Sequence, residues 1–190
     1  GPRVEETERQ VEEMENLIRG HRANAFQFVR AVSRAAFFGE AERMADIRKA
    51  NPGKEALIEK ISNSPSDRAF LDQVTAELGK EMFDLPGVIP PEDLKLMLAN
   101  IGISSRWSAI YTPNNGPHAA FLRVQLRSGF AGRTRPTTYY VDRLRTMLKN
   151  RFPTHDIYFE TGGMIRRILN SGAVAPIEVQ VFGRSHVERR

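Results

Sequence analysis

Residues 120–127 read AFLRVQLR, and this stretch decides the fold. Its even-numbered residues are small or aliphatic, whereas its odd-numbered residues are Phe121 followed by three polar side chains. This alternation with a period of two predicts an antiparallel strand that is buried on one face. The turn sequence PNNGP at 113–117 comes shortly before it, and residues 107–112 are a candidate for the preceding strand.

The segments on both sides of this strand predict an α+β fold. An amphipathic helix is expected at 4–19, with its apolar residues on one stripe. The other expected elements are a short helix passing into a strand at 94–101, a helix at 138–151, a strand at 156–160, a short helix at 164–170 and a strand at 177–181. With the strands in one antiparallel sheet and the helices on one face, this order predicts a split β-α-β, ferredoxin-like sandwich that lacks its first strand.

Residues 20–87 follow a different pattern, which predicts an all-helical lobe. Apolar residues recur at helical spacing over 23–38 and again over 41–47 after Gly39. A short helix is expected at 54–61. The sequence SPSD at 64–67 is typical of a helix start, and we expect the helix that follows it to run to about Phe83.

The composition excludes several classes of protein. The chain has 190 residues, of which 41% are hydrophobic and 27% charged, and this balance is typical of a globular fold. It contains no cysteine, so disulfides, thiolate metal ligands and cysteine nucleophiles are excluded. No apolar run reaches the roughly 20 residues that a membrane-spanning helix needs. Gly1 and Pro2 resemble the residues left after removal of a tag, so we expect a piece of a longer protein.

No group of residues predicts catalysis, a metal site or a cofactor. None of the histidines, at 21, 118, 155 and 186, is spaced with another ligand as a metal site requires. The glutamates of the first helix fit a solvated face, and Gly162 and Gly163 fit a turn better than a phosphate loop. The net charge of +5 leaves two alternatives open, a solvated basic surface or a patch that binds anions.

The segment around 102–117 is the candidate for a binding site. Trp107, Ile110 and Tyr111 lie among small and polar residues, where aromatic side chains either join a core or line a cleft. Both alternatives stay open from the residues alone.

Four blocks of the sequence resemble one family. In chain order they are VIPPEDLKLMLANIGI at 88–103, YTPNNGPHAAFLRVQL at 111–126, TTYYVDRLRTMLKNRFP at 137–153 and IYFETGGMIRRILNSGAVAPIEVQVFG at 157–183. They look like successive blocks of the resistance-nodulation-division (RND) efflux permeases of the hydrophobe and amphiphile class. In that family they lie in the porter region of the second periplasmic loop. Residues 4–19 resemble the first helix of the same subdomain.

The resemblance implies a division of the chain. Residues 1–19 and 88–163 would form a porter-like α+β subdomain, and residues 164–190 would begin the adjoining porter subdomain. In the family the first helix runs quickly into the VIPPEDL-like segment. Residues 20–87 therefore look like an inserted helical lobe, of natural or engineered origin.

The resemblance also implies a function without catalysis. The chain would be the periplasmic part of an inner-membrane, proton-driven transporter, which binds hydrophobic or amphiphilic small molecules and takes part in the conformational cycle. The parent would be a homotrimer that works with a periplasmic adaptor and an outer-membrane channel. By position, the substrate contacts would come from a set of six residues. They are Trp107, Ile110, Tyr111, Asn114, Asn115 and Gly116.

Other interpretations remain. The arginines, together with Phe121 and Tyr158, also suit a separate basic α+β module that binds nucleic acid, although no nucleic acid is implied by the family. The helical lobe also suits a protein-interaction module. Because the first strand of the sandwich is absent, we expect an exposed sheet edge or a strand borrowed from a second copy, which would make a swapped homodimer.

Overall fold

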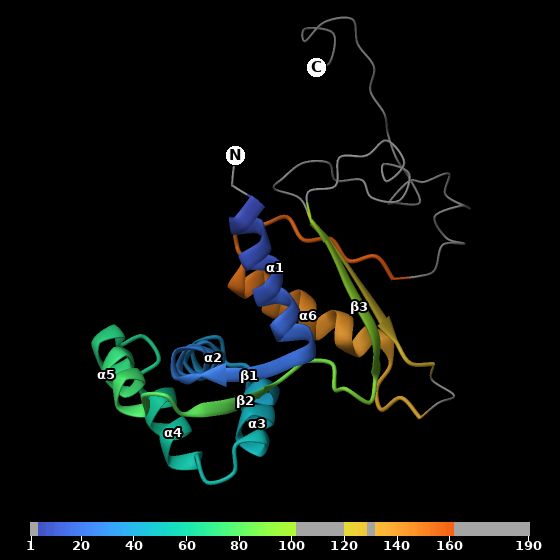
Figure 1. Ribbon diagram of the computed structural model, residues 1–190. Coiled ribbons are helices and arrows are strands. Elements are labelled where there is room, and N and C mark those ends of the chain that lie inside the picture. The colour runs from blue at the N-terminus through green and yellow to red at the C-terminus, as the bar shows by residue number, and fades with distance from the viewer. Residues whose placement is uncertain (1–3, 102–119, 129–131, 162–190) are drawn as a thin grey trace, which may run out of the picture.

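The structure is a computed structural model, and it describes residues 4–101, 120–128 and 132–161 (Figure 1). The described part contains helices and two antiparallel sheets of two strands each, so the fold belongs to the α+β class. The elements in chain order are α1 (Val4–Arg19), β1 (Gly20–Asn24), α2 (Ala25–Phe37), α3 (Ala41–Ala50), α4 (Glu55–Asn63), α5 (Arg68–Leu78), β2 (Met82–Pro86), β3 (Leu94–Ile101), β4 (Ala120–Leu126) and α6 (Thr137–Arg151). Among the described residues, no helix has the length and apolar composition that a bilayer span requires.

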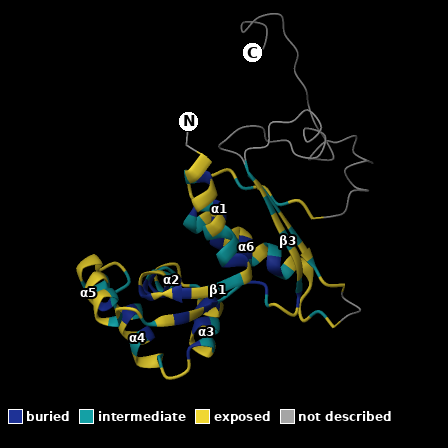
Figure 2. Ribbon diagram, viewed as in Figure 1, coloured by how far each residue is buried: buried dark blue, intermediate teal, exposed yellow. Residues whose placement is uncertain are grey.

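Within the described residues, most of the buried hydrophobic side chains belong to two hydrophobic clusters. The first contains α2 to α5 with β1 and β2, and the stacked rings of Phe28 and Phe83, 4.0 Å apart, lie at its centre. The second joins α1 and α6 to one face of the sheet formed by β3 and β4. We call residues 20–87 the loop lobe, and the described residues before and after them the sheet lobe. Figure 2 shows the buried residues gathered between the elements of each lobe.

The two lobes are joined by a narrow neck where the chain leaves and returns. Strands β1 and β2 pair antiparallel, with Gly20 opposite Pro86. Immediately beyond this pair, the Val88 N–H donates to the Leu17 carbonyl at 2.9 Å and the Ile89 N–H donates to the Ile18 carbonyl at 3.0 Å. The chain therefore returns, after the whole loop lobe, to the last turn of α1.

In the sheet lobe, the alternation of apolar and polar residues determines which face of the sheet is buried. Met97 pairs with Val124, and Ala99 pairs with Leu122, in an antiparallel register that contains an irregularity between Leu94 and Leu96. The side chains that face α1 and α6 join the second cluster, whereas Leu96 on the other face of β3 is exposed. One face of this sheet is therefore covered by helices.

Buried Asp93 connects the turn before β3 to α6. Its carboxylate accepts hydrogen bonds from the Thr134 N–H at 3.0 Å and the Thr134 hydroxyl at 2.7 Å, and from the Tyr140 hydroxyl. Burial acts to raise the pKa of Asp93, but these hydrogen bonds outweigh it, so the pKa lies below its ordinary value. An ionised carboxylate thus holds the turn at 90–93 and the start of α6 together.

Several expectations need correction. The loop lobe is not all-helical, because its two ends pair as β1 and β2 and so satisfy each other's backbone groups at the neck. The last helix of the lobe starts at Arg68, since Asp67 rather than Ser64 caps it, and it ends at Leu78. Phe83 therefore belongs to β2.

Two further expectations concern the sheet lobe. Residues 94–101 are a strand throughout, because they pair antiparallel with β4, and the turn closed by the Pro90 carbonyl lies before them. Residues 156–160 form no strand, although Ile157 and Phe159 pack on the second cluster. The predicted elements at 107–112, 164–170 and 177–181 lie outside the described residues.

Candidate functional site

The site expected from the sequence lies outside the described residues. This holds for Trp107, Ile110, Tyr111 and the turn 114–116, and also for Gly162 and Gly163. Of the four histidines, His21 and His155 are described, and the ring of His155 contacts the Gln10 amide oxygen at 2.9 Å. The part of the chain that the structure describes contains no group of three or more histidines, aspartates and glutamates that would hold a metal ion.

A cleft lies between the two lobes. It has a volume of about 300 Å³ and is lined by α1, β1 and α2, with contributions from α3, β2 and the end of α6. We call it the interlobe cleft. Its lining residues are Arg9, Glu12, Glu13, Asn16, Leu17, His21, Asn24, Phe26, Gln27, Arg30, Ala31, Arg34, Arg43, Leu85, Arg151 and Phe152.

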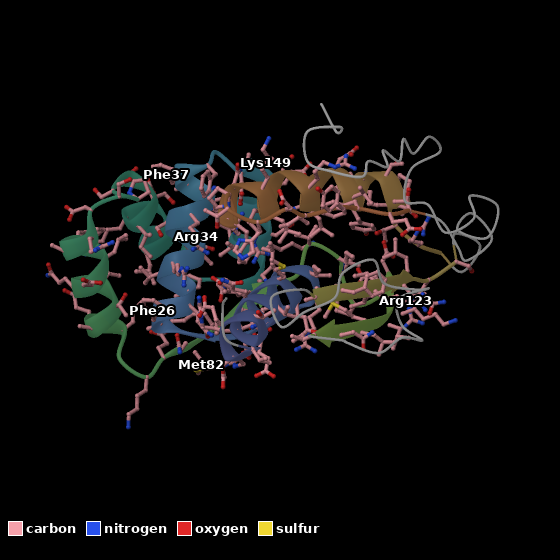
Figure 3. The ribbon with its side chains drawn as sticks, turned by 90° about the horizontal axis from the view of Figure 1, so that it is seen from above. Phe26, Arg34, Phe37, Met82, Arg123 and Lys149 are labelled. Carbon is pink, nitrogen blue, oxygen red and sulfur yellow. The ribbon has the colours of Figure 1, made fainter. Side chains whose placement is uncertain are left out.

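One carboxylate holds two arginines at the wall of this cleft. Oε1 of Glu13 on α1 lies 3.3 Å from Nη2 of Arg30 and 3.2 Å from Nη1 of Arg34, both on α2. Burial, and then the charge of Arg30, lower the pKa of Arg34. Figure 3 labels Arg34 and Phe26 on α2. The two arginines recur one helical turn apart, so both project from the same face of α2.

Arg43 is the most deeply buried charge at the cleft. Its side chain leaves only 3% of the residue exposed, and Nη1 donates to the Pro86 carbonyl at the neck. Nε has no hydrogen-bond partner, and Arg43 makes no ion pair within the described residues. Burial, followed by the charge of Arg151, lowers the pKa of Arg43 to about 10. The guanidinium is therefore still charged at neutral pH, and within the described residues its nearest negative charges, those of Asp46 and Glu40, act on it without a direct ion pair.

His21 of β1 lies beside this charge. Its ring is near the Asn16 carbonyl, but neither ring nitrogen makes a hydrogen bond of normal geometry. Burial is the main cause that lowers the pKa of His21, and the charges of Arg43 and Arg19 add to it. The lowered pKa favours the neutral imidazole at pH 7, and among the described residues its N–H donor has no hydrogen-bond partner of normal geometry.

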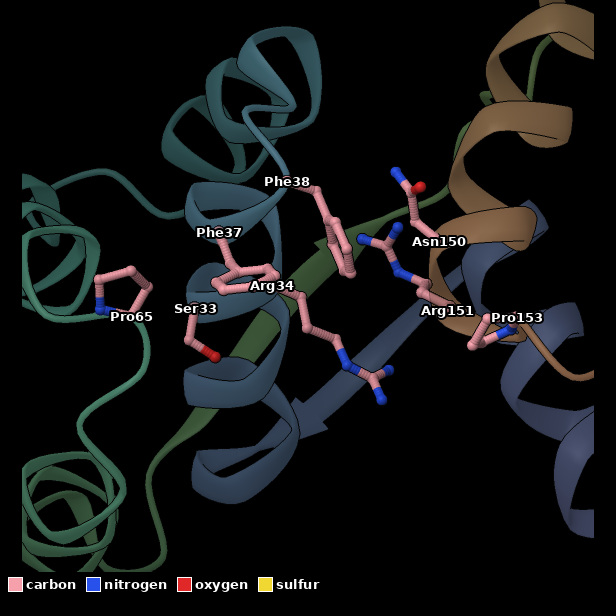
Figure 4. A pocket seen from close by; sticks show the side chains of 8 residues that line it. All are labelled: Ser33, Arg34, Phe37, Phe38, Pro65, Asn150, Arg151 and Pro153. Atoms are coloured by element: carbon pink, nitrogen blue, oxygen red, sulfur yellow. The ribbon is translucent and has the colours of Figure 1, made fainter.

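A second cavity of about 300 Å³ adjoins the first at the C-terminal end of α2. Figure 4 shows the side chains of Arg34 and Arg151 approaching the space between α2 and α6 from opposite sides. Both arginines also line the interlobe cleft, so the two cavities share one wall. Phe37 and Phe38 form the apolar part of the second cavity.

Charged side chains also fasten the lobes to each other. Arg143 of α6 lies 3.2 Å from Glu42 and 3.3 Å from Asp46 of α3. Arg151 of α6 forms a buried pair with Glu40, which precedes α3. The interface around the cleft is therefore held by ion pairs, while the apolar clusters lie within the lobes.

No residue of this cleft was expected to form a site from the sequence. The spacing of Arg30 and Arg34 on one helical face was a usable signal, and so was the single histidine of residues 20–87. Their acidic partner Glu13 lies on another helix, so no local pattern indicated the pairing. The described residues of the cleft offer fixed positive charge beside apolar walls, and none of them is a nucleophile placed next to a base.

No family model, no curated protein and no solved structure matches the chain.

Proposed function

We propose that the chain is the periplasmic porter part of a proton-driven efflux transporter of the RND family. It binds hydrophobic or amphiphilic small molecules and takes part in conformational cycling, without catalysing a reaction. Residues 1–19 and 88–163 form the porter-like subdomain, residues 20–87 are a lobe inserted into it, and residues 164–190 begin the adjoining subdomain. The parent protein is a homotrimer of the inner membrane, working with a periplasmic adaptor and an outer-membrane channel.

The neck is the observation that supports this proposal most directly. The family resemblance implies that the first helix runs quickly into the segment VIPPEDL. The structure holds Leu17 and Ile18, at the end of α1, by backbone hydrogen bonds to Val88 and Ile89. These contacts join the two resembling pieces of sequence in space, across the 68 residues of the loop lobe.

The order of elements in the sheet lobe also supports it. Helix α1, paired strands β3 and β4, and helix α6 follow one another with both helices on one face of the sheet. A split β-α-β, ferredoxin-like sandwich contains such a half. The proposal also assigns to this protein the remaining strands of that sandwich.

The experiment uses the only tryptophan of the chain as its reporter. Trp107 lies within the proposed substrate segment, so energy transfer from it to the neutral dye N-phenyl-1-naphthylamine measures binding near that segment. We expect Ile110→Ala and Tyr111→Ala each to weaken dye binding by about fivefold, because each removes apolar contact area.

The control is Tyr158→Ala, since Tyr158 is 80% exposed and belongs to neither cluster. Equal dye affinity in the wild type, Ile110→Ala and Tyr111→Ala would contradict the proposed substrate segment. Binding of single-stranded RNA that falls steeply with salt, in place of dye binding, would favour the nucleic-acid module instead.

A further inference from the structure

We infer that the interlobe cleft is a binding site for a small organic acid, in which a carboxylate or sulfonate is carried on an apolar body. This inference does not depend on the transport proposal. It concerns a cleft that is separate in sequence from residues 102–117, and it rests on the charge, burial and walls of the cleft.

The side chains that line the cleft favour an anion over a cation. Five arginines but only two glutamates line it. Two of these arginines pair with acids outside the lining, since Arg9 pairs with Glu6 and Arg151 pairs with Glu40. The wall of the cleft itself therefore presents more guanidinium donors than carboxylate acceptors.

Arg43 determines where a negative charge is needed. A buried cation without a counterion loses its hydration and gains no ion pair in return, so it is costly to the folded protein. Among the described residues Arg43 has no direct ion pair and its Nε has no hydrogen-bond partner, so the more distant carboxylates of Asp46 and Glu40 offset its burial only in part. An anion that binds in the adjacent cleft and displaces water from it would supply negative charge close to Arg43, where the remaining protein screens it less than water does.

Arg30 and Arg34 provide the hydrogen-bond donors at the mouth. They share the single carboxylate of Glu13, and each arginine carries five N–H donors, so most of their donors remain free for a ligand. Guanidinium groups match the two oxygens of a carboxylate or sulfonate in geometry. Neutral His21 adds an N–H donor from β1.

The size and walls of the cleft limit the rest of the ligand. Leu17, Ala31, Leu85 and Phe152 form apolar wall, and Phe26 is 57% exposed beside the arginines of α2. A volume of about 300 Å³ is at the lower end of the range for small-molecule sites. The cleft therefore suits an acid with one or two rings or a short aliphatic chain. A two-chain lipid or a nucleic-acid strand is too large for it.

A matched pair of dyes tests the inference. 1-Anilinonaphthalene-8-sulfonate and N-phenyl-1-naphthylamine have the same ring system, and only the first carries a sulfonate. We expect the double variant Arg30→Gln/Arg34→Gln to weaken binding of the sulfonate dye by about tenfold or more, because it removes charge-assisted hydrogen bonds. Binding of the neutral dye should be unchanged.

The control variant is Arg48→Gln, which removes the same charge from an exposed position on α3. It should leave the affinity for both dyes as in the wild type. A second measurement uses naphthalene-1-sulfonate without fluorescence detection. This acid should raise the midpoint of thermal unfolding of the wild type, and raise it much less in the double variant.

The outcomes separate this inference from the transport proposal. Equal sulfonate-dye affinity in the double variant and in Arg48→Gln would overturn the inference, whatever the neutral dye does at Trp107. An equal loss of affinity for both dyes in the double variant would also overturn it. The substitutions would then weaken binding by disturbing the fold and not by removing contacts to the sulfonate. Variants of Ile110 and Tyr111 test the transport proposal alone.

Discussion

The guanidinium of Arg151 donates to both carboxylate oxygens of Glu40, with Nη1 2.6 Å from Oε1 and Nη2 2.7 Å from Oε2. Both side chains are buried, at 7% and 9% exposed, and the pair links the end of α6 to the start of α3. Removing one partner leaves a buried charge unpaired. We therefore expect Glu40→Leu to lower the free energy of unfolding by roughly 3 kcal/mol, measured by urea denaturation.

The double variant Glu40→Leu/Arg151→Leu is the test of this explanation, since it leaves no charge behind. It should be more stable than Glu40→Leu alone. Asp142→Asn is the control, because its pair with Arg145 is exposed and should contribute less than about 1 kcal/mol. The explanation fails if Glu40→Leu costs no more than Asp142→Asn.

Gly20 and Gly53 test the close approach at the neck. Both have a positive φ, +79° and +81°, so alanine carries the same backbone strain at each, about 1–2 kcal/mol. They differ in their surroundings. A Cβ at Gly20 would lie 2.5 Å from the Gly87 nitrogen, whereas a Cβ at Gly53 would meet nothing within 4 Å.

We expect Gly20→Ala to lower the thermal midpoint far more than Gly53→Ala does, because only Gly20→Ala forces the two crossing segments of the neck apart. The same holds for Gly87→Ala, whose Cβ would lie 2.4 Å from the Ile18 carbonyl oxygen. Similar midpoints for Gly20→Ala and Gly53→Ala would show that the neck opens at little cost.

The helices were predictable because their signals are local. The apolar spacing of α2 is read within the helix, and Asn24 caps it by accepting a hydrogen bond from the Gln27 N–H. Strands β1 and β2 were missed for the opposite reason. Each has five residues, and their pairing joins Gly20 to Pro86 across the whole lobe, so no alternation over a longer stretch reveals them.

The interlobe cleft could not be predicted from the sequence, for a related reason. Glu13 meets Arg34 from 21 residues away, and Arg43 reaches the Pro86 carbonyl from 43 residues away. No local sequence pattern indicates that Arg30 and Arg34 share the carboxylate of Glu13, or that Arg43 is buried against the Pro86 carbonyl. Such a site can be recognised only from the three-dimensional arrangement of the two lobes. The segment 102–117 was singled out because aromatic residues in a polar loop are a local signal.

Asp93 predicts a dependence of stability on pH. Its pKa is lower in the folded protein than in the unfolded chain, where aspartate titrates near 3.9, so the unfolded state binds more protons as the pH falls. The stability that Asp93 contributes is present above the unfolded pKa and is lost as the pH falls through the folded pKa. We expect the thermal midpoint of the wild type to fall steeply below about pH 4.

Asp93→Asn should reduce this slope and lower stability at pH 7 by about 2 kcal/mol, because Tyr140 and Thr134 lose a charged acceptor. Asp72→Asn is the matched control, since Asp72 is exposed on α5, and it should keep the pH profile of the wild type. A wild-type profile in Asp93→Asn would show that other carboxylates cause the acid sensitivity.

Removal of the loop lobe tests the division of the chain. Because Gly20 and Gly87 are in backbone contact, deletion of residues 21–86 joins two points that already touch. The second cluster draws its residues from α1, from 88 onward and from α6, so we expect the shortened chain to keep a cooperative thermal transition. Its midpoint should be lower, since Arg143 and Arg151 lose their partners on the loop lobe.

The same variant separates the two binding proposals. The interlobe cleft takes most of its arginines from the deleted residues, so the shortened chain should lose the sulfonate dye and keep energy transfer from Trp107 to the neutral dye. Circular dichroism and calorimetry establish first whether it is folded. If it unfolds without a cooperative transition, the two clusters depend on each other, and the loop lobe is part of one folding unit with the sheet lobe.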